Sequence, residues 1–138
     1  MSETVTFKIE TRPEELEEIT SQVEGLADRE EWPPDLTFKI DLVLEEVGLN
    51  IMNHGHEGGL HEIEITLISE DKALTLEITD DGKPFDPLKD APLPDIDAEM
   101  EDRPIGGLGI HLVRTMMDEL CYRREQGKNH LTLVAHRG

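Results

Sequence analysis

Apolar and polar residues alternate with a period of two in five segments of the chain, which predicts strands with one buried face. These segments are residues 5–10, 62–67, 74–79, 122–126 and 130–136. Turn-forming residues at 69–72 and at Gly127 connect four of these segments into two antiparallel hairpins. The pattern therefore predicts a sheet that contains antiparallel pairs.

Apolar residues that recur at intervals of three and four predict three helices, at about residues 11–29, 35–55 and 108–120. Thr11 and Glu14 have the spacing of a capping box, and Asp35 is placed to cap the second helix. The order of the elements predicts an α+β domain. We expect a two-layer sandwich in which the helices cover one face of a mixed or antiparallel sheet.

Residues 82–106 follow neither period. The segment contains five of the chain's eight prolines and many acids, and a loop of this length is usually either a functional lid or disordered. We expect a lid at about residues 86–105. Because the chain has 138 residues and no linker-like segment, we expect one domain, residues 1–138.

The charge of the chain argues against two classes of function. The sequence has 13 Lys and Arg against 32 Asp and Glu, a formal net charge of -19. Such a surface repels phosphate backbones and anionic lipids, so neither nucleic acid nor a membrane is an expected partner. The absence of a long apolar stretch and of a signal-peptide pattern predicts a cytoplasmic protein. The single cysteine, Cys121, is expected in the core.

A first motif lies on the second predicted helix. Glu46, Asn50 and His54 are spaced four residues apart and would share one face beside the apolar face. A carboxylate and an amide oxygen one turn apart can serve a Mg²⁺ ion and its water ligands. A solvated helix face would have the same spacing, so the motif alone leaves both interpretations open.

A second motif follows the third predicted strand. Asp80 ends that strand, and Gly82 opens a Gly-Lys-Pro turn. A glycine lets a flat ligand approach the backbone, while the carboxylate accepts an N–H hydrogen bond from it. Adenine fits this description, and an ordinary Asp-Gly turn is the alternative.

A third motif opens the last predicted helix with Gly106, Gly107 and Gly109. Free amides at a helix N-terminus bind anions, and glycines let a phosphate approach closely. No parallel βαβ unit surrounds the cluster, so a Rossmann domain is not expected.

In this order, the three motifs resemble the N, G1 and G2 boxes of the GHKL superfamily of ATP-binding proteins, which have the Bergerat fold. They read E-x-x-x-N-x-x-x-H-G, D-x-G-x-P-F and G-G-x-G-I-x-L-V. The likeness covers nearly the whole chain and is greatest to the small anti-sigma-factor serine/threonine kinases. The chain departs from the family pattern at Ile51, at Arg103 and at residues 127–129, where Gly-Thr is more usual.

The resemblance implies a role for each box, with ATP and Mg²⁺ as cofactors. Asn50 would be a Mg²⁺ ligand in the nucleotide site, and Asp80, with Gly82 beside it, would recognise adenine. Glu46 would be the general base that takes the proton from an attacking hydroxyl. The phosphates would be held under the lid by Gly106, Gly107 and Gly109.

Two functions follow from the resemblance. The first is an ATP-dependent serine/threonine kinase, an anti-sigma-factor-type regulator that phosphorylates a STAS-type anti-sigma-factor antagonist. The alternative is a nucleotide-gated module that sequesters a sigma factor or another regulator without phosphoryl transfer. Glu46 favours the kinase, because binding of Mg-ATP alone needs no base at that position. The sequence leaves open whether a sigma factor binds and whether the chain forms a homodimer.

Overall fold

Five strands form one sheet in the computed structural model, which describes residues 2–52, 61–82 and 113–137. The strands are β1 (Glu3–Glu10), β2 (Glu62–Ser69), β3 (Ala73–Asp80), β4 (Glu119–Glu125) and β5 (Lys128–His136). Their order across the sheet is β1-β2-β3-β5-β4, and every neighbouring pair is antiparallel. The five predicted strands are therefore confirmed, and the sheet among these residues is antiparallel.

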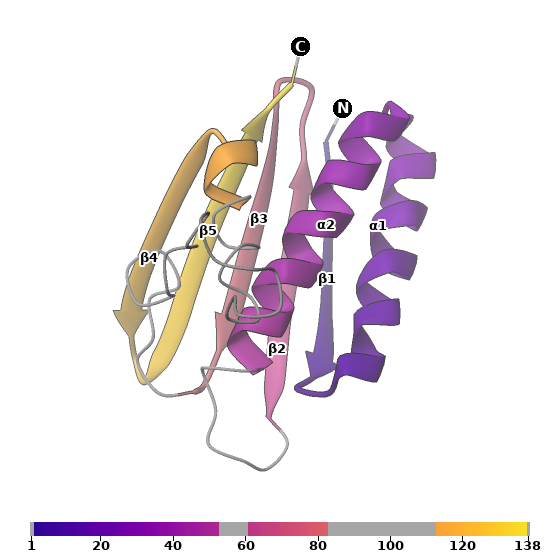
Figure 1. The fold of residues 1–138 in the computed structure, drawn as a ribbon. Helices are drawn as coiled ribbons and strands as arrows, with labels where there is room; N and C mark the ends of the chain where they lie inside the picture. Colours follow the sequence, from indigo (N-terminus) through magenta and orange to yellow (C-terminus); the bar gives the residue numbers. More distant parts are fainter. Residues whose placement is uncertain (1, 53–60, 83–112, 138) are drawn as a thin grey trace, which may run out of the picture.

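The two faces of this sheet differ in chemistry. Leu67, Leu76 and Leu133 lie opposite one another across the central strands and are completely buried. The adjacent positions on the other face are polar, for example the exposed Glu77. Figure 1 shows that both long helices lie on the apolar side of the sheet. The predicted two-layer α+β sandwich is confirmed.

The helices α1 (Leu16–Glu30) and α2 (Pro34–Asn50) lie side by side over the sheet (Figure 1). Their close approach depends on Gly48 of α2. A Cβ atom at this position would lie 3.3 Å from Cδ2 of Leu16 and 3.6 Å from Cδ1 of Ile19. A Cβ would thus be tight against Leu16, so the glycine helps α2 to lie close to the start of α1.

Both helices begin differently from the prediction. A 3₁₀ turn at Pro13–Glu15 precedes α1, and no side chain caps either helix. The Thr11 hydroxyl instead accepts a hydrogen bond from the backbone N–H of His61, at 3.0 Å, which ties it to the sequence before β2. Pro33 is the N-cap of α2, and Asp35 lies in the first turn. There its negative charge interacts favourably with the positive end of the helix dipole. The two capping predictions are wrong.

The last predicted helix extends too far. Residues 113–116 are helical, but the chain leaves the helix at residue 117 and β4 begins at Glu119. Leu120 pairs with Leu133 of β5, so sheet hydrogen bonds replace the final helical turn. Cys121 then faces away from the helices and is exposed; its predicted place in the core is wrong.

No helix within the described ranges combines the length and the apolar character needed to cross a membrane.

Candidate functional site

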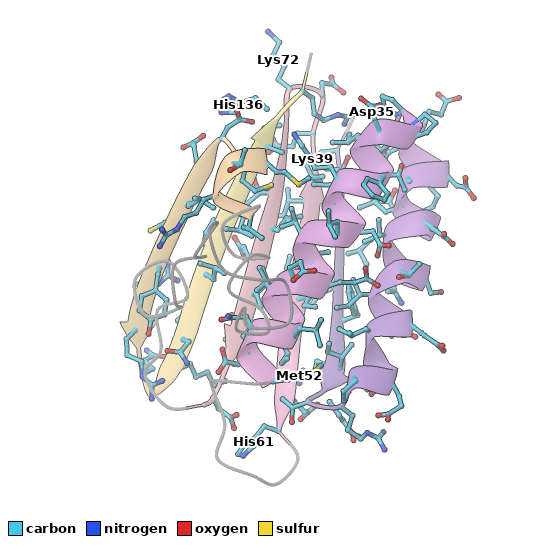
Figure 2. The ribbon with its side chains drawn as sticks, viewed as in Figure 1. Asp35, Lys39, Met52, His61, Lys72 and His136 are labelled. Carbon is cyan, nitrogen blue, oxygen red and sulfur yellow. The ribbon has the colours of Figure 1, made fainter. Side chains whose placement is uncertain are left out.

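The candidate site lies at the end of the sheet where both α2 and β3 terminate. Asn50 is the last residue of α2, and Asp80 is the last residue of β3. In Figure 1 the C-terminal end of α2 lies over the part of the sheet formed by β2 and β3. Figure 2 places Met52, just after α2, and His61, just before β2, at this same end. The fold thus brings Asn50 of the first motif and Asp80 of the second to one end of the molecule.

Asp80 is a buried carboxylate held by two donors. Its side chain is only 5% exposed. Its Oδ1 atom accepts hydrogen bonds from the backbone N–H of Gly82, at 2.9 Å, and from Nδ2 of Asn129, at 3.1 Å. The first bond shows that the Asp80 side chain closes a local turn with Gly82. The Gly82 donor of this turn and the Asn129 donor of β5 together restrict the rotation of the carboxylate.

Three residues of the closing hairpin complete this cluster, and sequence reasoning did not find them. Asn129 lies opposite Asp80 in the β3–β5 register, and its Oδ1 accepts a hydrogen bond from the Tyr122 hydroxyl. Arg124 donates from Nη1 to the carbonyl oxygen of Gly82, at 2.7 Å. The departure from Gly-Thr at residues 127–129 is the signal in the sequence that points to this part of the cluster.

Asn50 is completely buried and has unsatisfied polar atoms. Its exposed fraction is 0%, and among the residues that the structure describes neither amide atom has a hydrogen-bond partner. Leaving buried polar groups unpaired costs about 1–3 kcal/mol each, so native proteins nearly always satisfy them. The side chain therefore offers an acceptor oxygen and an NH₂ group with two donor hydrogens, and its oxygen is a type of ligand that Mg²⁺ accepts.

Glu46 lies one helical turn before Asn50 and is partly buried. Burial raises the pKa of the Glu46 carboxyl above its ordinary value. A raised pKa makes the carboxylate a stronger proton acceptor, which suits a general base near neutral pH. Unsatisfied amide atoms of Asn50 thus lie one helical turn from the partly buried carboxyl of Glu46.

A second acid, Glu45, lies beside Glu46 but packs toward α1. Burial and the nearby Asp41 carboxylate raise the pKa of Glu45, while a hydrogen bond from Thr20 opposes the change. The Thr20 hydroxyl lies 2.9 Å from Asp41 Oδ1 and 3.3 Å from Glu45 Oε1. Glu45 is therefore part of the contact between the two helices.

A model of the histidine kinase-like ATPase domain matches residues 9–135. This match covers more than nine-tenths of the chain, including both long helices, β2, β3, β4 and all but the last residue of β5, together with the end of β1. The chain belongs to the histidine kinase-like ATPase domain family. The resemblance to GHKL proteins stated from the three motifs is confirmed.

Curated relatives of this ATPase domain include bacterial protein kinases. The chain is 35% identical over 118 residues to the serine/threonine-protein kinase BtrW of Bordetella bronchiseptica, covering 83% of this chain and 80% of the relative. It is 28% identical over 128 residues to the serine-protein kinase RsbW of Bacillus thuringiensis, covering 91% of this chain and 80% of the relative. The RsbW of Bacillus cereus matches to the same extent.

Membership of the histidine kinase-like ATPase family implies that the domain binds ATP. Asn50, Asp80 and Gly82, with Glu46 beside Asn50, are the predicted site residues within the described part of the chain. The remaining predicted residues, Gly106, Gly107 and Gly109, lie outside the described residues, as do His54 and the lid at 86–105. Their roles stay predictions.

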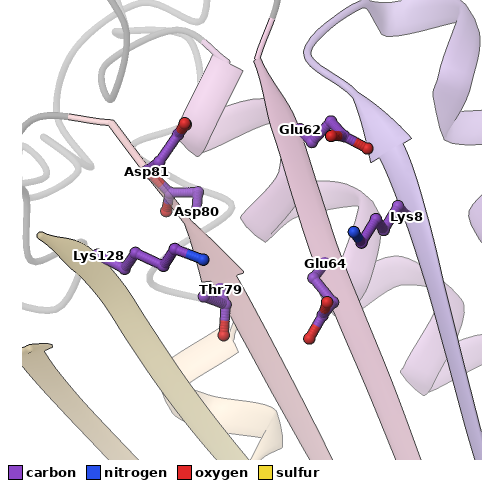
Figure 3. A pocket seen from close by; sticks show the side chains of 7 residues that line it. All are labelled: Lys8, Glu62, Glu64, Thr79, Asp80, Asp81 and Lys128. Atoms are coloured by element: carbon purple, nitrogen blue, oxygen red, sulfur yellow. The ribbon is translucent and has the colours of Figure 1, made fainter. Parts of the chain in front are cut away.

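A small hollow opens on the polar face of this ATPase domain, at the same end of the sheet. Its volume is about 140 Å³, and Figure 3 shows Lys8 reaching between Glu62 and Glu64 on one side of it. Lys128 extends from β5 on the other side. Because each lysine lies among acids, the hollow has no excess of positive charge for a phosphate. Its lining therefore does not favour the binding of an anion.

Proposed function

We propose that this chain is an ATP-dependent serine/threonine protein kinase of the anti-sigma-factor type. In this role it phosphorylates a STAS-type anti-sigma-factor antagonist in the cytoplasm, and a sigma factor is a further candidate partner. The family match and the two relatives named as protein kinases support the kinase class. The STAS partner follows from the resemblance of the three motifs to anti-sigma-factor kinases.

One observation carries the proposal. Asn50 is completely buried, has no described hydrogen-bond partner for either amide atom, and lies one turn from a carboxyl whose burial raises its pKa. A solvated helix face would give neither the unsatisfied amide nor the desolvated acid. The pair therefore fits a site that is completed by a bound ligand and that then uses a base.

Each described residue has a distinct task in this proposal. Asp80 accepts a hydrogen bond from the exocyclic amino group of adenine, and Gly82 leaves room for the base. The Asn50 oxygen would hold Mg²⁺, which neutralises charge on the triphosphate when bound. Glu46 takes the proton from a serine or threonine hydroxyl of the partner as that hydroxyl attacks the terminal phosphate.

The bonding changes in this reaction are simple. The partner oxygen forms a bond to the terminal phosphorus of ATP, and the bond from that phosphorus to the bridging oxygen of ADP breaks. The proton of the hydroxyl passes to the Glu46 carboxylate. A nucleotide-gated binding module would bind the same ATP but transfer nothing, so Glu46 would have no task there.

Capture of the partner tests the proposed function. The purified chain is used to capture proteins from its own cell lysate with and without ATP, and the captured proteins are searched for phosphoserine and phosphothreonine. We expect one partner of STAS type that gains a phosphate only when ATP is present. Capture of a partner that ATP never modifies would favour the nucleotide-gated module.

A further inference from the structure

A groove between the C-terminal half of α1 and the N-terminal half of α2 lies away from the candidate site. It has a volume of about 540 Å³, and its apolar lining is formed by Ala27, Trp32, Pro34 and Phe38. Figure 2 marks Asp35 near the start of α2 and Met52 just beyond its end. The groove lies at the Asp35 end, and Asn50 lies at the other.

Phe38 is the unusual residue of this groove. The residue is 67% exposed, and every other large apolar residue in the described part of the chain is at least partly buried. A single exposed apolar residue needs no explanation by itself. Phe38, however, borders a groove that also contains Trp32, whose indole N–H is already used in a 3.1 Å hydrogen bond to Ser69 Oγ. Trp32 is only 7% exposed, so the indole contributes a small apolar area to the groove and no free donor.

The rest of the groove wall is acidic. Glu24, Asp28 and Asp41 line it, and within the described ranges no Lys or Arg does so. None of the three carboxylates forms an ion pair with a described basic side chain. An apolar floor with an unneutralised acidic rim attracts a ligand that is both apolar and cationic.

We propose that this groove docks a segment of a protein partner that combines a large apolar side chain with flanking Lys or Arg residues. An amphipathic helix has this composition and fits a groove between two helices. A second copy of this chain fits poorly, because a symmetric contact would bring the same three acids of both copies together. The net charge of -19 adds to that repulsion.

The groove also has a geometric relation to the candidate site. Phe38 and Glu46 belong to the same helix and are eight residues apart, or about 12 Å along its axis. A partner anchored at Phe38 is thus held on the helix that carries the proposed base. Only this consequence rests on the proposed kinase function, since docking itself requires no ATP.

Trp32 provides a direct measurement, because it is the chain's only tryptophan and lines the groove. The probe is a synthetic basic amphipathic helix of about four turns, with leucines on one face and lysines and arginines beside them. We expect its addition to the full chain to change the emission of Trp32 in a saturable manner. Two control peptides replace the leucines by alanine or the basic residues by glutamate, and neither should bind.

Substitutions localise the binding. Phe38→Ala removes the exposed anchor, and Asp28→Lys reverses one charge of the rim; each should weaken binding of the basic peptide about ten-fold or more. Glu77→Lys makes the same charge change on the polar face of the sheet, where Glu77 is exposed, and should leave binding nearly unchanged. Circular dichroism checks that each variant is folded.

Three results would overturn the proposal. The first is no change in Trp32 emission up to millimolar peptide, and the second is equal weakening by Glu77→Lys and Asp28→Lys. The third is a dimer in sedimentation that Phe38→Ala converts to a monomer, since the occupant would then be a second copy.

The Asp80→Asn variant, which should lose ATP affinity, should still bind the peptide. Peptide binding without any phosphorylation of a captured partner would contradict the proposed kinase function but not the proposed docking.

Discussion

Asp80 is the residue on which the proposed recognition of adenine depends. The Asp80→Asn variant keeps the size of the side chain but changes one oxygen to an amide donor, which would face the amino group of adenine. Because an unpaired buried polar group costs about 1–3 kcal/mol, ATP binding should weaken roughly ten-fold or more. Calorimetry measures this loss. The parent protein should also prefer ATP to GTP, and equal affinity for the two nucleotides would contradict the assignment.

Asn129 should act as a positioning residue for that carboxylate. It donates to Asp80 Oδ1 and accepts from Tyr122, so Asn129→Ala removes one of the two described donors that fix Oδ1. We expect weaker ATP binding and a smaller preference for ATP over GTP, by about three- to ten-fold. Thr132→Ala, three residues further along β5 on the other face, is the control. A variant at Asn129 that loses stability but keeps the full ATP preference would show a merely structural role.

Glu46 should lower the stability of the folded chain at neutral pH. Burial raises its pKa in the folded state above the value in the unfolded chain, so its contribution to stability is present at low pH and is lost as the pH rises through the folded pKa. Glu46→Gln resembles the protonated form and should therefore be more stable than the parent at pH 7. Urea unfolding should show this gain at pH 7 and little difference near pH 4. A Glu46→Gln variant that is less stable at pH 7 would contradict the desolvated carboxylate.

The packing of α2 on α1 makes a prediction at the scale of an element. Gly48→Val places methyl groups beyond a Cβ position that is already 3.3 Å from Leu16, so we expect a loss of about 1–3 kcal/mol in the free energy of unfolding. Gly25 of α1 provides the matched control, because a Cβ there meets only the end of the Arg29 side chain, at 3.4 Å. Gly25→Ala should raise stability by about 0.5–1 kcal/mol. Denaturant unfolding of both variants tests the close crossing of the helices. If Gly48→Val left the free energy of unfolding unchanged, the close crossing would be excluded.

The elements that sequence predicted best are those in which local pattern and tertiary packing agree. The strands alternate because one face of the sheet is buried, and this period is visible in the sequence. The end of the last helix was predicted too late because apolar residues such as Leu120 suit either a helix or a strand, and pairing with Leu133 decides between them. The Thr11 capping box failed for a similar reason, since the hydroxyl bonds to His61 across the fold.

The same reason explains what sequence could not reveal about the candidate site. Glu46 and Asn50 are neighbours on one helix, so their spacing was informative. Asn129 and Asp80 are far apart in the sequence and meet only through the register of β3 and β5. Burial was also invisible: nothing in the spacing indicated that Asn50 would be completely enclosed with unsatisfied amide atoms.

At the scale of the whole molecule, the described surfaces separate two tasks. One end of α2 carries the candidate ATP site, and the other carries the acidic groove that contains Phe38. The strongly acidic chain should bind basic partners more tightly at low salt, and binding at the groove should weaken as salt rises. Because the two surfaces lie at opposite ends of α2, ATP binding and partner docking can be measured independently.

The most direct test of the central claim is phosphoryl transfer to the identified partner by the parent chain and by Glu46→Gln, measured with radiolabelled ATP under single-turnover conditions. We predict that the parent places phosphate on a serine or threonine of the partner. Glu46→Gln should bind ATP with similar affinity. It should transfer the terminal phosphate roughly 10²-fold more slowly, because glutamine cannot accept the proton of the hydroxyl. Equal rates for the two proteins, or no transfer by a parent chain that binds ATP, would contradict the account.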